Sequence, residues 1–122
     1  MFSFLTDLFK PKPPVAPPIT SETSMNFDAE DVGPFMTVLS NNARFGLPGE
    51  LGAFMRQEVS KLALDETKRW KIDGDFDGSP VQIDIEVYMD DVDAPDLTFF
   101  STKSVIAEID RELLAFGAAM GK

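Results

Sequence analysis

Residues 67–88 constrain the fold of this chain more than any other part of its sequence. Apolar and polar residues alternate on both sides of the dipeptide Asp77-Gly78, a pattern typical of two antiparallel strands joined by a two-residue type I′ turn. The turn sets a register in which one face matches Trp70 with Ile85, Ile72 with Ile83, and Gly74 with Val81. Because a slip of one residue would move every side chain to the other face, the sequence predicts this hairpin in this register.

The other face of the same hairpin is expected to carry pairs of opposite charge. In the register set by the turn, Arg69 faces Glu86 and Lys71 faces Asp84. Opposite charges directly across a sheet stabilise it modestly, whereas like charges in those positions would destabilise it. Both faces therefore favour one register.

The remaining hydrophobic pattern predicts an α+β domain with two N-terminal helices, a three-stranded antiparallel meander, and a C-terminal helix packed on one sheet face. The first two helices are expected within residues 28–41 and over residues 48–64, where Pro48 suits a first helical turn. Residues 97–101 are expected to return as the third strand, and residues 104–120 to form the last helix.

Apolar spacing also predicts which helical side chains face the core. The inward residues of the second helix are expected to be Leu51, Phe54, Met55, Val59 and Leu62. On the last helix, the charged residues expected to face outward are Glu108, Arg111 and Glu112.

An apolar peptide precedes the domain and is separated from it by prolines. Residues 1–9 are expected to form a short amphipathic docking peptide, residues 10–25 a proline-rich linker, and residues 26–122 an acidic α+β domain. The expected partner-binding residues of the peptide are Phe2, Phe4, Leu5, Leu8 and Phe9. Three of them, Phe2, Leu5 and Phe9, share one face of a helix.

The sequence leaves three possible docking sites for this peptide. It can dock into a groove of another protein, which we favour, or of a second copy, which would make a homo-oligomer. It can also fold back onto its own domain. Membrane contact is the weakest alternative, because Lys10 and Lys12 supply only two positive charges beside an acidic domain.

The chain contains no cysteine and no histidine. Disulfides, thiolate nucleophiles, the common zinc sites and the usual general base near neutral pH are therefore excluded. Carboxylates are so numerous that some pair at a catalytic spacing is expected by chance. We expect a non-enzymatic protein with no catalytic residue and no cofactor, and keep a carboxylate-based or metal-dependent enzyme as the third hypothesis.

Residues 73–78, Asp-Gly-Asp-Phe-Asp-Gly, match the opening of a calcium-binding loop, in which oxygen ligands alternate and a glycine makes the sharp turn. The last ligand position would fall on Asp84, whose side chain is shorter than the usual glutamate. Since the hairpin already accounts for these residues, no metal site is predicted.

The net charge of −10 lies entirely on residues 25–122, because the charges of the first 24 residues cancel. Such a domain repels phosphate, so direct binding of nucleic acid is not expected, whereas a basic protein surface would be attracted. The hairpin and the loop after it are expected to carry an acidic surface made of Asp73, Asp75, Asp77, Asp84, Glu86, Asp90, Asp91, Asp93 and Asp96. Its alternative interpretation is a solvated sheet face.

These observations favour two functions. The first is a non-enzymatic protein-protein interaction subunit or adaptor of a larger assembly, anchored by residues 1–9. The alternative is an acidic inhibitor or nucleic-acid mimic that binds a basic groove of a partner through its Asp-rich hairpin and loop. A cytoplasmic location is expected, because no stretch approaches the roughly 20 apolar residues of a membrane span and the N-terminus lacks a basic secretory leader.

Overall fold

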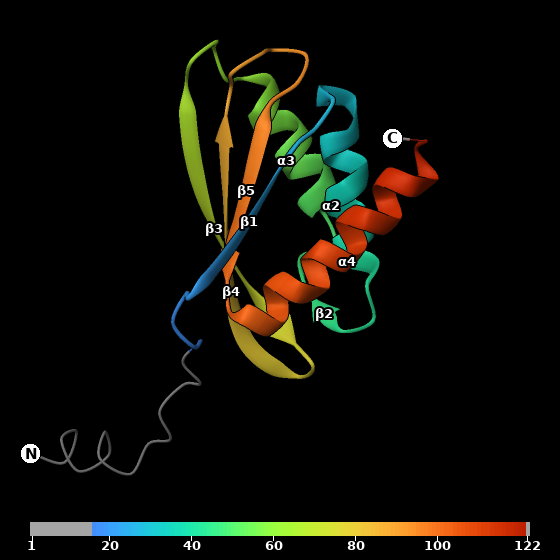
Figure 1. Cartoon of the computed structure of the whole chain (residues 1–122). Coiled ribbons are helices and arrows are strands. Elements are labelled where there is room, and N and C mark those ends of the chain that lie inside the picture. The colour runs from blue at the N-terminus through green and yellow to red at the C-terminus, as the bar shows by residue number, and fades with distance from the viewer. Residues whose placement is uncertain (1–15, 122) are drawn as a thin grey trace, which may run out of the picture.

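Residues 16–121 are described by the computed structural model of the chain, and they form a curled antiparallel sheet with helices against one side (Figure 1). The strands are β1 (Ser21–Asn26), β2 (Phe45–Gly46), β3 (Thr67–Phe76), β4 (Ser79–Tyr88) and β5 (Asp96–Ser101). The helices are the short 3-10 helix η1 (Ala29–Asp31), α2 (Val32–Asn41), α3 (Leu51–Ser60) and α4 (Lys103–Ala119). Among these residues, no helix combines the length and the apolar character that crossing a membrane requires.

The hairpin between β3 and β4 is confirmed in the predicted register. Its facing pairs include Trp70 with Ile85, Ile72 with Ile83, Gly74 with Val81, Arg69 with Glu86, and Lys71 with Asp84. Asp77 and Gly78 form the turn with φ angles of 51° and 82°. A type I′ turn needs positive φ at both positions, which glycine adopts without strain because it has no Cβ.

The third predicted strand and the C-terminal helix are also present. β5 pairs antiparallel with β4, for example through Phe99 and Ile85. Thr102 precedes α4, and its side-chain oxygen accepts a hydrogen bond of 3.3 Å from the backbone N–H of Val105. This bond satisfies one of the free donors at the start of the helix.

The prediction of two N-terminal helices followed by a three-stranded meander is wrong, because the sheet has five antiparallel strands in the order β1-β5-β4-β3-β2. β1 precedes the first helix and lies among residues predicted as linker, and β2 separates α2 from α3. The β1 sequence, Ser-Glu-Thr-Ser-Met-Asn, carries no strand signal and is ordered by pairing with β5 along its whole length. β2 has two residues, too few for an alternation to be recognised.

The core lies between the sheet and the helices, and Phe35 of α2 is at its centre. Phe35 is fully buried, and its ring centroid lies 5.2 Å from that of Phe27, 5.9 Å from Phe99 and 5.4 Å from Phe116. Aromatic pairs at these distances add to the stabilisation from buried area. The cluster ties α2 and α4 to β5 and to the segment that follows β1.

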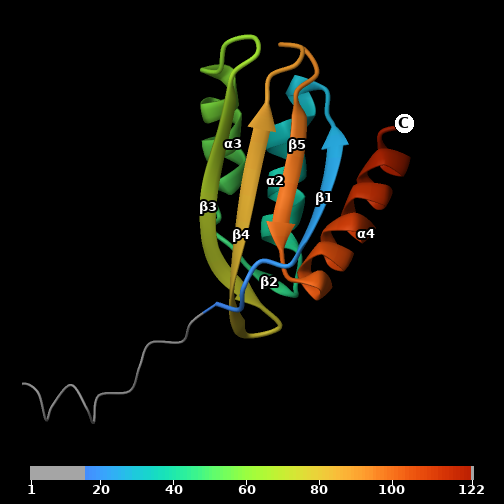
Figure 2. The same cartoon turned by 60° about the vertical axis from the view of Figure 1, so that its left-hand side comes forward.

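The opposite face of the sheet carries no helix (Figure 2). Burial alternates along β3 and β4, so that apolar side chains point towards the helices and polar ones towards this open face. The outward residues of the two strands include Arg69, Lys71, Asp73, Asp75, Gln82, Asp84 and Glu86.

α2 and α3 cross closely at two glycines, Gly33 and Gly52. A Cβ atom at position 52 would lie 2.8 Å from the carbonyl oxygen of Gly33, and it would also clash with the hydroxyl of Thr37. Because the Gly33 oxygen belongs to the backbone, rotation of a side chain cannot relieve the clash. The missing Cβ of Gly52 therefore sets the separation of the two helices.

We expect Gly52→Ala to destabilise the fold by about 1–3 kcal/mol, because α2 and α3 must separate to admit the methyl group. Alanine would stabilise an open helical position by about 1 kcal/mol, so the sign of the change tests the contact. Gly49→Ala is the matched control, since a Cβ there meets no atom within 4 Å. Urea denaturation of both variants measures the effect, and a Gly52→Ala variant as stable as the wild type would contradict the close approach.

Candidate functional site

One edge of the sheet is unpaired along most of β3. β2 pairs only with the last two residues of β3, and the chain then turns away at Leu47 and Pro48. Proline has no N–H and cannot extend a strand ladder from its own position. Residues 67–74 of β3 consequently have a neighbouring strand on the β4 side alone.

Alternate residues of β3 point their backbone groups at this free edge. The N–H of Asp77 donates to the carbonyl of Arg44 on the β2 side, at 2.8 Å, and in an antiparallel ladder every second residue points the same way. The N–H and C=O groups of Arg69, Lys71 and Asp73 therefore point away from β4. Within residues 16–121, no backbone segment pairs with them on that side.

A groove of about 410 Å³ lies beside this edge, between β3 and the start of α3. We call it the edge groove, and its lining residues are Pro48, Glu50, Leu51, Phe54, Trp70, Lys71 and Ile72. Phe54 was expected in the core, but 41% of its surface is exposed here. Leu51, Trp70 and Ile72 of the same lining are buried, so Phe54 provides most of the apolar surface that the groove exposes.

Trp70, which lines the edge groove, has a buried indole N–H. Its Nε1 has no hydrogen-bond partner among the described residues. The N–H faces Glu58 closely enough to help lower the pKa of that carboxyl, after the larger effects of Lys61 and Lys68, but without the geometry of a hydrogen bond. Lys68 bonds to Glu58 at 3.3 Å and lies 5.3 Å from the centre of the Trp70 ring, so this cluster ties α3 to β3.

Lys71 adds a positive charge at the edge groove. Its cross-strand neighbour is Asp84, but Asp84 accepts a 2.9 Å hydrogen bond from Arg69 instead. Arg69 also lies 4.0 Å above the ring of Phe100, a cation–π contact that holds the guanidinium on the open face. No carboxylate within residues 16–121 forms an ion pair with Lys71, so its ammonium group is available to a ligand.

The nine acidic residues predicted as one surface lie in three places. Near the hairpin turn are Asp73, Asp75 and Asp77; beside Arg69 are Asp84 and Glu86; in or next to the β4–β5 loop are Asp90, Asp91, Asp93 and Asp96. Since β3 and β4 are each ten residues long, the turn and that loop are separated by about 30 Å. The structure brings the last four together but does not bring them to the turn.

The β4–β5 loop and the start of η1 form an acidic end of the domain. The N–H of Ala29 donates to the carbonyl of Asp93 at 2.8 Å. A hollow of about 360 Å³ at this place is lined by Asp28, Ala29, Glu30 and Asp93. Two segments far apart in the sequence thus bring carboxylates to one end, which periodicity along the chain could not reveal.

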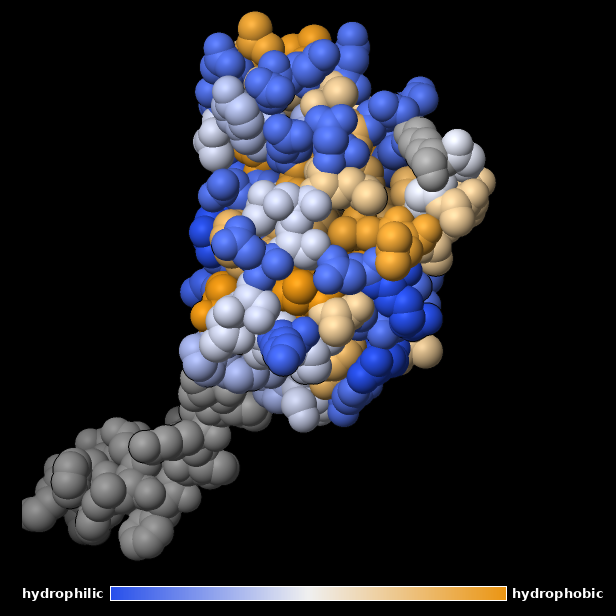
Figure 3. Space-filling model, in the orientation of Figure 1, coloured by the Kyte–Doolittle hydropathy of each residue, from blue (hydrophilic) through white to orange (hydrophobic). Residues whose placement is uncertain are grey.

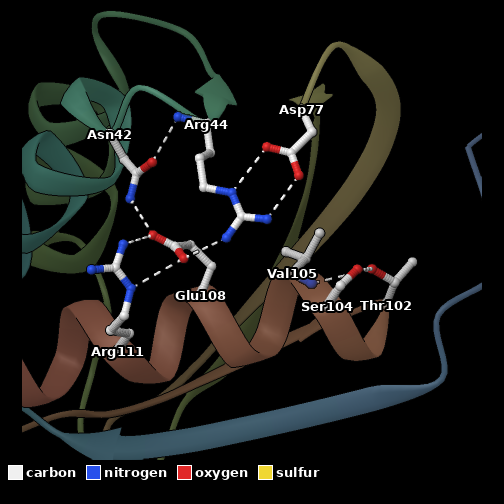
Figure 4. Close-up of polar contacts among 8 residues, drawn as sticks. All are labelled: Asn42, Arg44, Asp77, Thr102, Ser104, Val105, Glu108 and Arg111. Carbon is white, nitrogen blue, oxygen red and sulfur yellow. Dashed lines mark hydrogen bonds and ion pairs between the residues drawn. The ribbon is translucent and has the colours of Figure 1, made fainter.

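Glu108 was expected to face solvent, but it is buried, with 3% of its surface exposed (Figure 4). It accepts hydrogen bonds from Asn42 at 2.8 Å, from Arg44 at 2.9 Å and from Nε of Arg111 at 3.2 Å. Arg44 in turn holds both carboxylate oxygens of Asp77, at 2.9 and 2.7 Å. The network joins α4, the loop after α2 and the hairpin turn.

These donors hold the pKa of Glu108 at about 2, with the Arg111 hydrogen bond as the largest cause. Burial alone would raise the pKa, so the ion pairs outweigh the loss of solvent. Each carboxylate oxygen already accepts two hydrogen bonds. Because no acceptor is left for a ligand, we assign this network to the stability of the fold.

A second apolar surface lies along the C-terminal half of α4, where Figure 3 shows hydrophobic colour gathered. Leu114 is 75% exposed there, and Met120 and Met25 are also exposed. Residues 113–121 contain no charged side chain. Met25 lies on β1, which is also an edge strand and pairs only with β5 among the described residues.

The predicted partner-binding residues of the N-terminal peptide lie outside the described residues, so their role stays a prediction. Residues 73–78, which match a calcium loop, form the end of β3 and the hairpin turn. In the described part of the chain, no group of three or more Asp or Glu side chains is arranged so that it could hold a metal ion.

No protein-family model, curated protein or solved structure matches this chain. A fold alone does not imply a function, so the function must be argued from the sites themselves. The edge groove combines the exposed aromatic side chain of Phe54 with backbone groups that have no partner among the described residues.

We expect Glu108→Gln to destabilise the fold by about 2 kcal/mol at neutral pH, because two arginines lose a charged acceptor. The lowered pKa of Glu108 means that its contribution is complete above the ordinary value of 4.5 and is lost as the pH falls from there towards about 2. The stability difference from wild type, measured by urea denaturation, should therefore shrink over that range.

Glu112→Gln is the matched control for this experiment, because Glu112 lies on the same helix and makes none of these hydrogen bonds. Its effect on stability should be small at every pH. A Glu108→Gln difference that does not change between neutral and acidic pH would show that the carboxylate is not ion-paired.

Proposed function

We propose that this chain is a non-enzymatic protein-protein interaction subunit whose domain binds an extended peptide segment of a partner along the free edge of β3. The observation that carries the proposal is the coincidence of the unpaired edge with the edge groove. In binding by strand addition, backbone hydrogen bonds supply affinity, and a neighbouring groove that takes alternate side chains supplies specificity.

The geometry of the edge suggests which peptides fit. The outward backbone groups of Arg69, Lys71 and Asp73 would pair with the peptide backbone. Every second peptide side chain would then point towards the helices and meet Leu51 and Phe54 in the edge groove. The expected ligand is therefore a segment with apolar residues at alternate positions, and the ammonium group of Lys71 favours an acidic residue between them.

Charged residues on an edge strand also protect proteins against unwanted pairing, and β3 carries Lys68, Arg69 and Lys71. Two of these charges are already engaged, Lys68 with Glu58 at 3.3 Å and Arg69 with Asp84 at 2.9 Å. Lys71 has no ion-pair partner among residues 16–121, so its single positive charge is a weak barrier to a peptide. Asp73 on the same strand and Glu50 in the edge groove add negative charges near it.

The acidic end supports the alternative function, an acidic inhibitor or nucleic-acid mimic that binds a basic surface. The carboxylates of η1 and of the β4–β5 loop are close together there, and such a surface accelerates association with a basic partner. Salt separates the two proposals, because at half-molar ionic strength the Debye length falls to roughly 4 Å and exposed charges are screened. Binding at the edge groove should persist under these conditions.

The anchoring role of residues 1–9 in a larger assembly and the cytoplasmic location are parts of this proposal that rest on the sequence.

We expect Lys71→Pro to weaken binding of edge-directed peptides at least tenfold, because it removes an N–H that points to the free edge while leaving the β3–β4 ladder intact. Ten-residue peptides selected from a displayed library on the wild-type chain provide the ligands. Lys71→Thr is the matched control, since it removes the same charge but keeps the N–H.

Binding of the selected peptides to the Lys71→Thr variant should stay within about threefold of wild type, and circular dichroism of both variants should match the wild type. Equal affinities for the proline and threonine variants, or a library that yields no binder, would rule out strand addition at this edge.

A further inference from the structure

We propose that the Asp77-Gly78 dipeptide is a site of isoaspartate formation, and that the ion pair of Asp77 with Arg44 slows this modification in the folded protein. The proposal goes beyond the proposed function, because it concerns the hairpin turn and its covalent integrity. The chain contains two Asp-Gly dipeptides, at residues 73–74 and 77–78, and the structure places them in different surroundings.

Isoaspartate forms from an Asp-Gly dipeptide without an enzyme or a cofactor. The glycine nitrogen attacks Cγ of the aspartate; its hydrogen and the hydroxyl of the protonated carboxyl group leave together as water. A water molecule then adds to the α-carbonyl carbon of the ring and breaks its bond to the nitrogen. The main chain afterwards runs through Cβ and Cγ, the α-carboxylate has become the side chain, and no atom has been gained or lost.

The hairpin turn leaves the Asp77-Gly78 dipeptide open to this reaction. The Asp77 side chain is 52% exposed, and a Cβ atom on Gly78 would meet nothing within 4 Å, so water reaches the dipeptide. The N–H of Gly78 donates to no group among residues 16–121, because the hydrogen bond of such a turn comes from its fourth residue. The attacking nitrogen is therefore free.

The Asp73-Gly74 dipeptide is protected by the sheet. Gly74 faces Val81 in the β3–β4 ladder, and the alternation that turns the backbone groups of Asp73 outward directs the N–H of Gly74 to β4. A Cβ atom on Gly74 would lie 2.6 Å from the carbonyl oxygen of Gly46, so β2 packs closely against it. Since the ring can close here only when the ladder opens, Asp73 is an internal reporter of unfolding.

Arg44 opposes the reaction at Asp77 in two ways. It donates to the two carboxylate oxygens at 2.9 and 2.7 Å and points the carboxylate at its guanidinium group (Figure 4). Ring closure requires Cγ to rotate onto the glycine nitrogen, which breaks both hydrogen bonds. The same bonds lower the pKa of Asp77, and the ionised carboxylate has no hydroxyl to lose.

Arg44 is itself held in place by its neighbours. Its guanidinium group donates to Glu108 at 2.9 Å and lies 4.5 Å from the centre of the Phe76 ring. Its backbone carbonyl accepts the 2.8 Å hydrogen bond from the N–H of Asp77. An exposed ion pair is weak when two free side chains must be ordered to form it. Here the arginine is already ordered, so the pair persists.

Isoaspartate at position 77 would disrupt the turn that sets the hairpin register. The main chain between β3 and β4 would gain one atom, so the two-residue type I′ geometry would be lost. The pairing of Trp70 with Ile85 depends on that geometry. The ion pair with Arg44 thus preserves the arrangement of β3, including its free edge.

Incubation of the full chain at neutral pH and 37 °C tests the proposal. Digestion followed by electron-transfer fragmentation locates isoaspartate at each position. We expect Arg44→Ala to raise the rate at Asp77 by about fivefold or more, because the carboxylate loses both charge-assisted hydrogen bonds, while the rate at Asp73 stays within about twofold. Arg44→Lys keeps the charge but not the paired donors, so its rate at Asp77 should lie between the two.

Arg111→Ala is the matched control, because it removes an arginine from Glu108 and leaves the contacts of Asp77 in place. Its rate at Asp77 should stay within about twofold of wild type. Wild-type chain unfolded in urea should form isoaspartate at Asp73 and Asp77, at both positions faster than when folded.

An Arg44→Ala rate at Asp77 equal to that of the wild type or of Arg111→Ala would overturn the proposal. A rate at Asp77 that is no faster in urea than in the folded wild type would overturn it as well. If Arg44→Ala raises the rates at Asp73 and Asp77 together, that variant has opened the sheet, and Arg44→Lys decides. An increase confined to Asp77 in Arg44→Lys supports the proposal, and no increase there refutes it.

Discussion

Positive φ angles at Asp77 and Gly78 hold β3 and β4 in a single register, and that register decides what each face of the domain presents. Trp70 and Ile72 point to the helices, whereas Arg69 and Lys71 point to the open face. The same alternation directs the backbone groups of Arg69 and Lys71 to the free edge. The core, the charged face and the edge groove are consequences of one turn, and Arg44 holds that turn through two hydrogen bonds to Asp77.

Much of the fold could be predicted where the sequence pattern is long and its signals agree. The hairpin, β5 and α4 each carry a periodic apolar pattern with a turn or cap residue at one end, and each was found in the structure. β1 could not be predicted, because its residues are polar and its order comes from pairing with a strand far along the chain. β2 could not be predicted for another reason, since a strand of two residues is too short to show an alternating pattern.

The sites were less predictable than the fold because they depend on how separate elements meet. Periodicity assigned Phe54 to the core, since it shares a helical stripe with Leu51 and Met55, but β2 ends too early to cover it. Glu108 lies one helical turn from Arg111 and Glu112, which indicated exposure, yet Arg44 and Arg111 compensate its charge in the interior. Likewise, the run of acidic residues gave no sign that ten-residue strands would spread it over both ends of the domain.

The pairing of β1 with β5 has a consequence for how the protein is made. A ribosome adds about 5–20 residues each second, so the stretch that becomes β1 leaves it well before the stretch that becomes β5. The hairpin of β3 and β4 can close from neighbouring residues while β1 still has no strand to join. β1 can therefore enter the sheet only after β5 has been made, and until then its backbone stays accessible to cellular factors.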